Sequence, residues 1–428
     1  MLFVSSASIK VPLTKVVLPL STAVDLVSPV VFDHHVKVAY IAYKISEQMG
    51  LPPAKREEVF IAGALHDIGA LSLQERLDAL NFDVFYDAAI HRHAEIGYRL
   101  LKLFEPFSNV ARIVRFHHYA WDYGRGRSVN GEEVPLESHL IHLSDRISVL
   151  VHSEEDVLTQ AERIRKKIRE LSGEVFNPEI VEAFMELSFK EYFWFDLTSN
   201  ILRNSLYDLI GLSVVFLDRE KLEELARLFS HVIDFRSRFT ATHSFGVAAT
   251  AEKIAEFYKF SEMERHIIRI AGYFHDLGKL AVPTYILEKP GRLTSSEYNV
   301  MKSHAFYSYR ILETIDGFDI INAWGALHHE RLDGSGYPFH LTMESIPLGA
   351  RIMAVADVFT ALTEDRPYRK GMKLKEALKI IKNMVSEGKL CGDTVYLLEK
   401  NIDEIDFCRS VSQKEASKVY ERFWRGNS

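Results

Sequence analysis

Hydrophobic residues recur at helical spacing along most of this chain. Between Val247 and Tyr258 the apolar positions are Val247, Ala248, Ala251, Ile254, Ala255 and Tyr258, the pattern of one buried helical face. Thr294 to Glu297 has the form of a capping box, so we expect a helix that begins there and carries His304. Alternating strand patterns are scarce, and β-rich runs such as 214–217 are short. The pattern predicts an all-α fold.

One pattern occurs twice, about 210 residues apart. Segment 62–69 parallels 271–278, and segment 34–45 parallels 243–254. Histidines and aspartates recur in the same order: the first copy has His34, His66, Asp67, His93, His117, His118 and Asp145, and the second has His243, His275, Asp276, His304, His328, His329 and Asp357. Ten of the 18 histidines belong to this pattern, which indicates a duplicated domain. We expect a first domain over 1–190, a helical connection over 191–225 and a second domain over 226–428.

Composition narrows the class of protein. Hydrophobic residues make up 47% and charged residues 26% of the chain, as in ordinary globular proteins. The net charge of −7 and the absence of a long Lys/Arg run argue against binding to duplex nucleic acid. Two cysteines provide no disulfide framework, which fits a cytoplasmic protein. The apolar run 16–24 is interrupted by Pro19 and is too short to span a membrane, so we interpret it as a packed N-terminal element.

The second copy has the donors of a metal site. The adjacent pair His275 and Asp276 offers an imidazole and a carboxylate, which suit borderline divalent metals. Seven candidate ligands are more than one ion takes while leaving room for substrate, so they favour two ions. Two ions about 3.5–4 Å apart provide a nucleophile and offset charge in phosphoester hydrolysis.

At these residues the chain resembles the HD superfamily of metal-dependent phosphohydrolases, and specifically its HD-GYP branch. The doublet His275-Asp276 is typical of the superfamily. The branch signature stands at 328–338 as HHERLDGSGYP, followed by GARI at 349–352, VAD at 355–357 and DRPYR at 365–369. The branch resemblance covers about residues 235–400, and the generic HD pattern covers much of 30–190.

The resemblance implies two tandem HD-type domains and hydrolysis of 3'-5' cyclic dinucleotides, either cyclic di-GMP or 3'3'-cyclic GMP-AMP, to a linear dinucleotide and in some members to mononucleotides. It implies two divalent ions, usually Fe or Mn, held by His243, His275, Asp276, His304, His328, His329 and Asp357, with Asp276 bridging and catalytic. Lys279 would contact the scissile phosphate and assist catalysis. Arg366 and Arg369 match positions that bind substrate.

Some features have a simpler structural interpretation. Some family members carry a glutamate four residues before the first ligand and bind three metals, whereas this chain has Phe239 there, so we predict two, although another carboxylate could replace it. Arg366 and Arg369 could be structural ion-pair partners, and Lys279 a solvated cation at a helix end. Asp333 could cap a turn without touching substrate.

The first copy departs from the second at two places. Ala70 replaces Lys279, and His118 is followed by YAWDYGRG at 119–126 with no Gly-Tyr-Pro. A phosphate would lose a cationic contact there. We expect a degenerate, regulatory HD domain that can still bind metal through the seven donors of its copy, and that tunes the second through metal, nucleotide, a second subunit or a signalling partner. A domain kept only for packing is the alternative.

Two other functions fit part of the pattern. The protein could hydrolyse another nucleotide phosphoester, against which the branch signature argues. It could also be a non-catalytic signalling protein that binds metal or cyclic dinucleotide, against which Lys279 and Asp276 argue.

Overall fold

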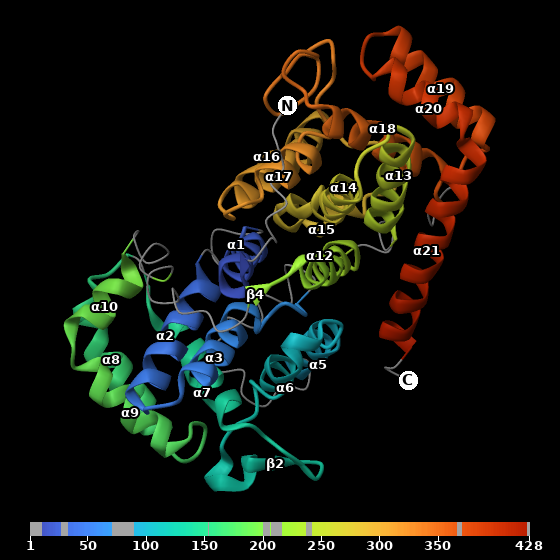
Figure 1. The fold of residues 1–428 in the computed structure, drawn as a ribbon. Helices are drawn as coiled ribbons and strands as arrows, with labels where there is room; N and C mark the ends of the chain where they lie inside the picture. Colours follow the sequence, from blue (N-terminus) through green and yellow to red (C-terminus); the bar gives the residue numbers. More distant parts are fainter. Residues whose placement is uncertain are drawn as a thin grey trace. The chain divides into compact units, whose positions relative to one another are not determined.

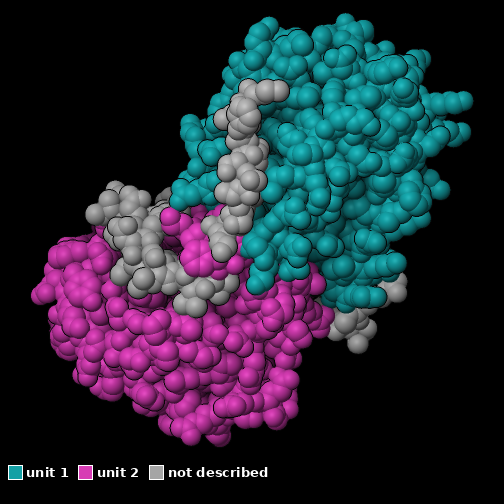
Figure 2. Space-filling view, viewed as in Figure 1, with its two compact units in different colours: residues 1–9, 218–428 teal, residues 10–217 magenta. Residues whose placement is uncertain are grey.

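The computed structural model describes residues 11–26, 33–70, 90–152, 154–199, 206, 216–236, 242–365 and 370–425. The chain divides into two compact units, one within residues 10–217 and the other within residues 218–428 (Figure 2). Helices dominate both units (Figure 1), which confirms the all-α prediction. The division at 217 and 218 lies inside the predicted connection, and the predicted domain limits stay predictions.

The first unit is a helical domain with two minimal pairs of strands. Its elements are β1 Val11–Pro12, α1 Leu13–Asp25, α2 His34–Gln48, α3 Pro53–Leu65, α5 Ile90–Leu101, η2 Glu105–Phe107, α6 Ser108–Arg115, η3 Asp122–Arg127, β2 Ser128–Val129, β3 Glu132–Glu133, α7 Leu136–Leu150, α8 Val157–Glu170, α9 Pro178–Ser188, α10 Glu191–Thr198 and β4 Phe216–Leu217. Helix α2 packs against α3, α7 and α9, and this group positions the first set of histidines. β1 pairs with β4, and β2 with β3, both antiparallel.

Helix α1 is the packed N-terminal element that the apolar run 16–24 predicted. It packs against α2 and α3, and most of its residues are buried, although Pro19 lies inside it. Throughout the described residues, no helix combines the length and apolarity needed to cross a membrane.

The second unit repeats the arrangement and adds helices at its C-terminal end. Its elements are α12 Arg219–Asp234, α13 His243–Phe257, α14 Glu262–Phe274, η4 Leu277–Ala281, α15 Thr284–Leu287, α16 Ser295–Glu313, α17 Asp319–Gly325, α18 Leu348–Thr363, α19 Leu374–Ser386, α20 Gly392–Lys400 and α21 Ile402–Arg425. Helix α13 is central and packs against α14, α18 and the long α21.

Two sequence predictions about these helices are confirmed. Val247, Ala248, Ala251 and Ile254 of α13 are all buried, as their spacing required. Thr294 forms the predicted capping box with Glu297 and starts α16, which carries His304. Because Thr294 and Glu297 together fix where α16 begins, they also fix the position of His304 along the helix.

Glycine allows the closest helix contacts in both units. A Cβ on Gly278 would lie 2.0 Å from the carbonyl oxygen of His304, and one on Gly69 would lie 2.1 Å from that of His93. No side chain fits at either distance. The glycine after each His-Asp pair therefore lets the helix with the third histidine approach that pair directly.

Candidate metal centres

Five segments of the second unit bring the seven predicted donors together. α13 begins at His243, α14 ends at His275-Asp276, α16 carries His304, the turn after α17 contains His328-His329, and α18 carries Asp357. The Nε2 atoms of His275, His304, His328 and His243 lie 3.1, 3.4, 3.9 and 4.0 Å from the Asp276 carboxylate. Nε2 of His243 also lies 3.2 Å from Oδ1 of Asp357. Asp276 is therefore the centre of the cluster.

Each histidine ring is oriented by a backbone carbonyl that lies three residues earlier in the chain. The Nδ1 atoms of His275, His304 and His328 lie 2.7, 2.6 and 2.8 Å from the carbonyl oxygen three residues earlier. Those carbonyls can only accept, so each Nδ1 carries the proton and each Nε2 keeps its lone pair. The first unit does the same at His66 and His117.

The Nε2 atoms so oriented suit a metal ion. Those of His275, His304 and His328 are buried and have no hydrogen-bond partner among the described residues. Buried polar atoms without a partner are costly in a folded protein. Two groups of donors within 4.8 Å of one another result: His304 with His328 and His329, and His243 with His275 and Asp276. The donor set therefore fits divalent cations.

Burial and neighbouring charges set the protonation states. Burial lowers the pKa of His328 to about 3, with His275 adding to the effect, and it also lowers the pKa of His304. Burial alone would raise the pKa of Asp276, but His275 and Lys279 hold it well below its usual range. Neutral imidazoles beside ionised carboxylates are the forms that bind metal.

His243 has a carboxylate on each edge of its ring. Nδ1 lies 3.1 Å from Glu364, which is 4% exposed, while Nε2 faces Asp357. Burial opposes the charge of His243, but Glu364 and Asp357 outweigh it and raise its pKa to about 10, so a metal ion that binds at Nε2 must displace a proton. Glu364 was not predicted, although it directly precedes the quoted motif at 365–369.

Lys279 lies beside the central aspartate. Its Nζ donates to Oδ2 of Asp276 at 2.5 Å, and its side chain is 18% exposed, compared with 3% for Asp276. The Lys279 side chain is therefore mostly buried and its ammonium is paired with the central carboxylate of the donor cluster. This ion pair makes the reading of Lys279 as a merely solvated cation wrong.

The signature loop, residues 330–341, is held by a buried carboxylate. Glu330 is 2% exposed and accepts the backbone N–H groups of Phe339 at 2.7 Å and Leu341 at 2.9 Å. The Tyr337 ring then lies 4.7 Å from the ring of His329. The loop therefore forms one wall of the cluster. The sequence motif contained Glu330, but nothing in its position specified this role.

Asp333 caps a turn in the same loop. Its Oδ1 accepts the backbone N–H of Ser335 at 2.9 Å and the Ser335 hydroxyl at 2.7 Å. These bonds support the structural interpretation of Asp333. Phe239, Arg366 and Arg369 lie outside the described residues.

The first unit gathers its seven donors in the same way. Nε2 of His93 and His117 lie 3.0 and 3.6 Å from Oδ1 of Asp67, and Nε2 of His34 lies 3.3 Å from Oδ1 of Asp145. One donor group contains Asp67, His93, His117 and His118, and another contains His34, His66 and Asp145. Burial lowers the pKa of His66 to about 3, so its imidazole is neutral.

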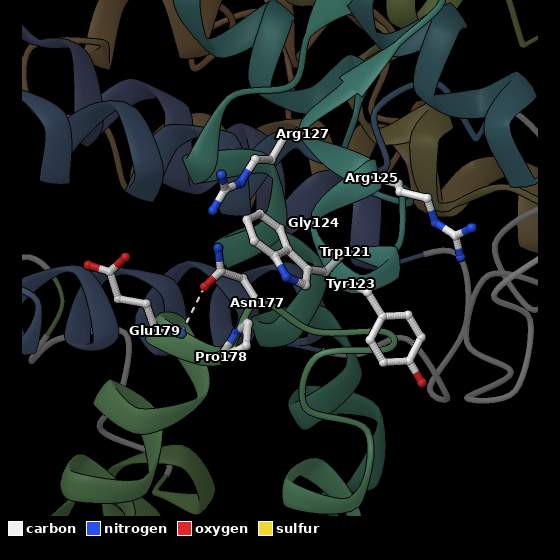
Figure 3. Close-up of a pocket in the computed structure, with 8 residues that line it drawn as sticks. All are labelled: Trp121, Tyr123, Gly124, Arg125, Arg127, Asn177, Pro178 and Glu179. Atoms are coloured by element: carbon white, nitrogen blue, oxygen red, sulfur yellow. Dashed lines mark hydrogen bonds between the residues drawn. The ribbon is translucent and has the colours of Figure 1, made fainter.

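The segment after His118 follows a different course from the signature loop. The backbone N–H groups of Trp121, Asp122 and Tyr123 donate to carbonyls of residues 173–175. An open pocket forms here, lined by Trp121, Tyr123, Gly124, Arg125, Arg127, Asn177, Pro178 and Glu179 (Figure 3). Arg127 lies over the indole of Trp121, 4.9 Å from the ring centre. The first unit therefore has no equivalent of the Tyr337 wall among its described residues.

Comparisons with known proteins match both halves. Models described as HD domain match residues 31–150 and 206–390. The chain is 31% identical over 392 residues to the 3'3'-cGAMP-specific phosphodiesterase 1 of Vibrio cholerae, covering 89% of this chain and 90% of that protein. It is 45% identical over 163 residues to the cyclic di-GMP phosphodiesterase response regulator RpfG of Xanthomonas campestris, covering 38% of this chain and 42% of that protein.

A solved structure shares the fold. The crystal structure of a cyclic GMP-AMP specific phosphodiesterase of V. cholerae, V-cGAP3, matches with a TM-score of 0.65 at 24% identity, covering 93% of this chain and 98% of that one. The match extends over both domains, so the tandem arrangement is common to the two chains.

Proposed function

Since the chain belongs to the HD-GYP family of metal-dependent HD-domain phosphohydrolases, we propose that its second domain is a phosphodiesterase that opens the ring of a 3'-5' cyclic dinucleotide. The observation that carries the proposal is the convergence of unpartnered imidazole nitrogens on Asp276, with Lys279 beside it. The relatives are named for 3'3'-cGAMP and for cyclic di-GMP. The two compounds share a ring closed by 3'-5' phosphodiester bonds, which is the substrate class proposed here.

We assign seven residues of the second domain as ligands of two divalent ions, Fe or Mn. Asp276 is the proposed bridge because imidazoles from four segments face its two oxygens. The ligands are His243, His275, Asp276, His304, His328, His329 and Asp357. Glu364 is assigned no ligand role, because it lies at Nδ1 of His243, away from the Nε2 edge. Glu364 therefore does not replace the glutamate that some family members carry at the position of Phe239. This supports a site with two ions and not three.

When bound, two such ions would supply a nucleophilic oxygen and offset charge on phosphate. Lys279 has two tasks in this proposal. Its ammonium neutralises the non-bridging phosphate oxygens, and it hydrogen-bonds to the 3' oxygen as negative charge develops there. Arg366 and Arg369 are proposed to bind the other parts of the dinucleotide, where a planar guanidinium suits phosphate or a guanine edge.

The reaction consumes one water. The P–O3' bond breaks, the phosphate stays on the 5' oxygen of the neighbouring nucleoside, and the 3' oxygen takes a proton. The first product is a linear dinucleotide with a terminal 5' phosphate. Tyr337 and the signature loop limit access of solvent to one side of the reacting phosphate.

The test is anaerobic purification of the full chain, elemental analysis, and assay against cyclic di-GMP and 3'3'-cyclic GMP-AMP. We expect two ions in the second domain and turnover to linear dinucleotide. Replacing His275 and Asp276 by alanine should abolish turnover, whereas the matched change of His66 and Asp67 should not. Turnover of other nucleotide phosphoesters alone would identify a different hydrolase, and absence of any turnover in metal-loaded protein would identify a binding protein.

For the first domain we propose a regulatory role. Its donors are all present, but Ala70 provides no cation where the second domain has Lys279. Replacing Asp67 by alanine should change the metal content and either the activity or the assembly of the full chain. If all three stay as in the unchanged protein, the domain serves only as a scaffold.

A further inference from the structure

The helices that begin with the first ligand of each unit differ at their second residue. This residue is Ser244 in α13 and His35 in α2. In each unit a buried aspartate accepts a hydrogen bond from the backbone N–H of this residue. Asp234 accepts from Ser244 at 3.1 Å, and Asp25 accepts from His35 at 3.2 Å. The same helix start therefore presents a hydroxyl in one unit and an imidazole in the other.

The two side chains have opposite consequences for metal binding. The Ser244 hydroxyl donates to Asp234 at 2.9 Å, so its proton is engaged by that carboxylate. His35 also contacts its aspartate, through Nδ1 and Oδ1 of Asp25. Its second nitrogen, Nε2, lies on the opposite edge of the ring from Asp25 and keeps a lone pair that can bind a metal ion. A carboxylate on one nitrogen of a histidine is the usual support of a metal-bound ring, since it fixes the tautomer and strengthens the donor.

The free nitrogen of His35 lies among the other donors. Its Nε2 is buried and has no hydrogen-bond partner within the described ranges. Together with His66 and Asp67, His35 offers donor atoms that all lie within 4.8 Å of one another. The rings of His66 and His34 lie 5.0 and 5.6 Å from its own. His35 is thus an eighth donor that the repeat pattern could not reveal, because the second copy has none at this position.

We propose that the first domain binds a divalent metal in a closed site, in which His35 takes the coordination position that a substrate would need. Structural metal sites are closed by protein ligands, whereas catalytic sites keep an open position. In this proposal His35 converts an open site of the catalytic type into a closed site of the structural type. The bound ion stabilises the fold of the first domain and does not process a phosphoester.

The charges around the first cluster fit the same role. Arg146 is 1% exposed, and its Nε and Nη2 atoms donate to Oδ2 of Asp145 at 3.1 and 2.6 Å. The guanidinium occupies one oxygen of Asp145 and leaves Oδ1 facing His34. In the second unit, Val358 follows Asp357, so the matching position carries no guanidinium. The internal cation of the first unit thus neutralises a ligand and does not approach a substrate.

The donor types select the class of metal. Several imidazoles with one or two carboxylate oxygens suit zinc or ferrous ions better than Mg²⁺ or Ca²⁺, which prefer oxygen ligands alone. We therefore use Zn²⁺ as the probe, with Mg²⁺ as the comparison.

The experiment uses the full chain with His275 and Asp276 replaced by alanine, so that metal in the second domain is lost. After loading with Zn²⁺ and gel filtration, this protein should retain at least one ion per chain. Adding His35→Ser should weaken Zn²⁺ binding by at least about tenfold in competition with a chelator. Serine is the residue of the second copy and can bond to Asp25 as Ser244 does to Asp234, so this variant should fold.

Two further measurements separate a ligand from a packing residue. His139→Gln changes another buried histidine of the first domain that belongs to none of the donor groups, and it should leave Zn²⁺ affinity unchanged. With Mn²⁺ in place of Zn²⁺, relaxation of water protons should be slow in the closed site and faster in His35→Ser, where water gains a position. Mg²⁺ should not compete.

Three results would overturn the proposal. The first is that the chain with His275 and Asp276 replaced by alanine retains no Zn²⁺ after gel filtration. The second is an unchanged affinity in His35→Ser when its circular dichroism matches that of the parent. The third is rapid water relaxation before His35 is changed, which would mean that the site is open.

Discussion

The carboxylate of Glu364 lies 3.1 Å from Nδ1 of His243, on the edge of the ring opposite Nε2, which faces Asp357 at 3.2 Å. Glu364 also accepts from Nε2 of Gln413 in α21 at 3.2 Å. In the first unit, His34 instead has the hydroxyl of Ser148 at 3.2 Å from Nδ1. Among the described residues, a carboxylate therefore contacts Nδ1 of the first ligand in the second unit, whereas a hydroxyl does so in the first unit.

Glu364→Gln should weaken metal binding in the second domain. The amide keeps the shape but not the charge that holds the proton on Nδ1, so affinity should fall by about 10–100-fold. Chelator competition measures this in a chain whose His66 and Asp67 are alanine, so that the first domain does not contribute. The control is Glu404→Gln, which changes an exposed glutamate paired with Lys253. Equal affinities for the two variants would rule out a positioning role for Glu364.

Lys279→Met should lower turnover without removing metal. The loss of one donor to developing negative charge costs about 10²–10³ in kcat. Metal content should persist, because the imidazoles that face Asp276 are unchanged. The comparison is Lys253→Met in the same unit, since Lys253 pairs with glutamates away from the cluster. Full activity in Lys279→Met would contradict the catalytic role.

Much of this arrangement could be predicted from the sequence, because the repeat fixed the order of the donors. Histidine and aspartate types at matching intervals identify positions such as His275 and His66 without coordinates. The residues that escaped prediction are those whose role depends on a neighbour distant in sequence. Glu364 meets His243 across 121 residues, and only packing of α18 against α13 reveals it.

His35 escaped for another reason. A comparison of the two copies selects what they share, and His35 is present in one only. Its only sequence signal is the doublet His34-His35. A doublet by itself does not distinguish a metal ligand from a histidine that packs in the core. The link to Asp25 shows its orientation, and that link depends on how α1 packs against α2.

Glu330→Ala should loosen the signature loop. The change leaves the N–H groups of Phe339 and Leu341 without their acceptor, and each buried unsatisfied group costs about 1–3 kcal/mol. We expect a lower melting temperature and a raised KM, because Tyr337 no longer stays beside His329. Glu330→Gln keeps one accepting oxygen and should have an intermediate effect. An unchanged KM in the alanine variant would show that the loop is held by other contacts.

The pH dependence of stability should depend in part on His231 of α12. This histidine is 5% exposed and lies over the ring of Phe245, 4.6 Å between ring centres. Burial, together with Arg227, lowers its pKa to about 3, compared with about 6.5 in an unfolded chain. Above pH 6.5 the ring is neutral in both states, so it adds no pH dependence there.

Between pH 6.5 and 3 the unfolded state binds more protons at this position than the folded state does. The free energy of unfolding therefore falls as pH falls, by up to about 1.4 kcal/mol per pH unit from His231 alone. His231→Gln removes this contribution, so its melting temperature should fall less steeply from pH 6.5 to 5 than that of the unchanged protein. The other titratable groups contribute equally to the curves of both proteins, so the difference between the two curves isolates His231. Parallel curves would mean that His231 gains its proton as readily in the folded state as in the unfolded one.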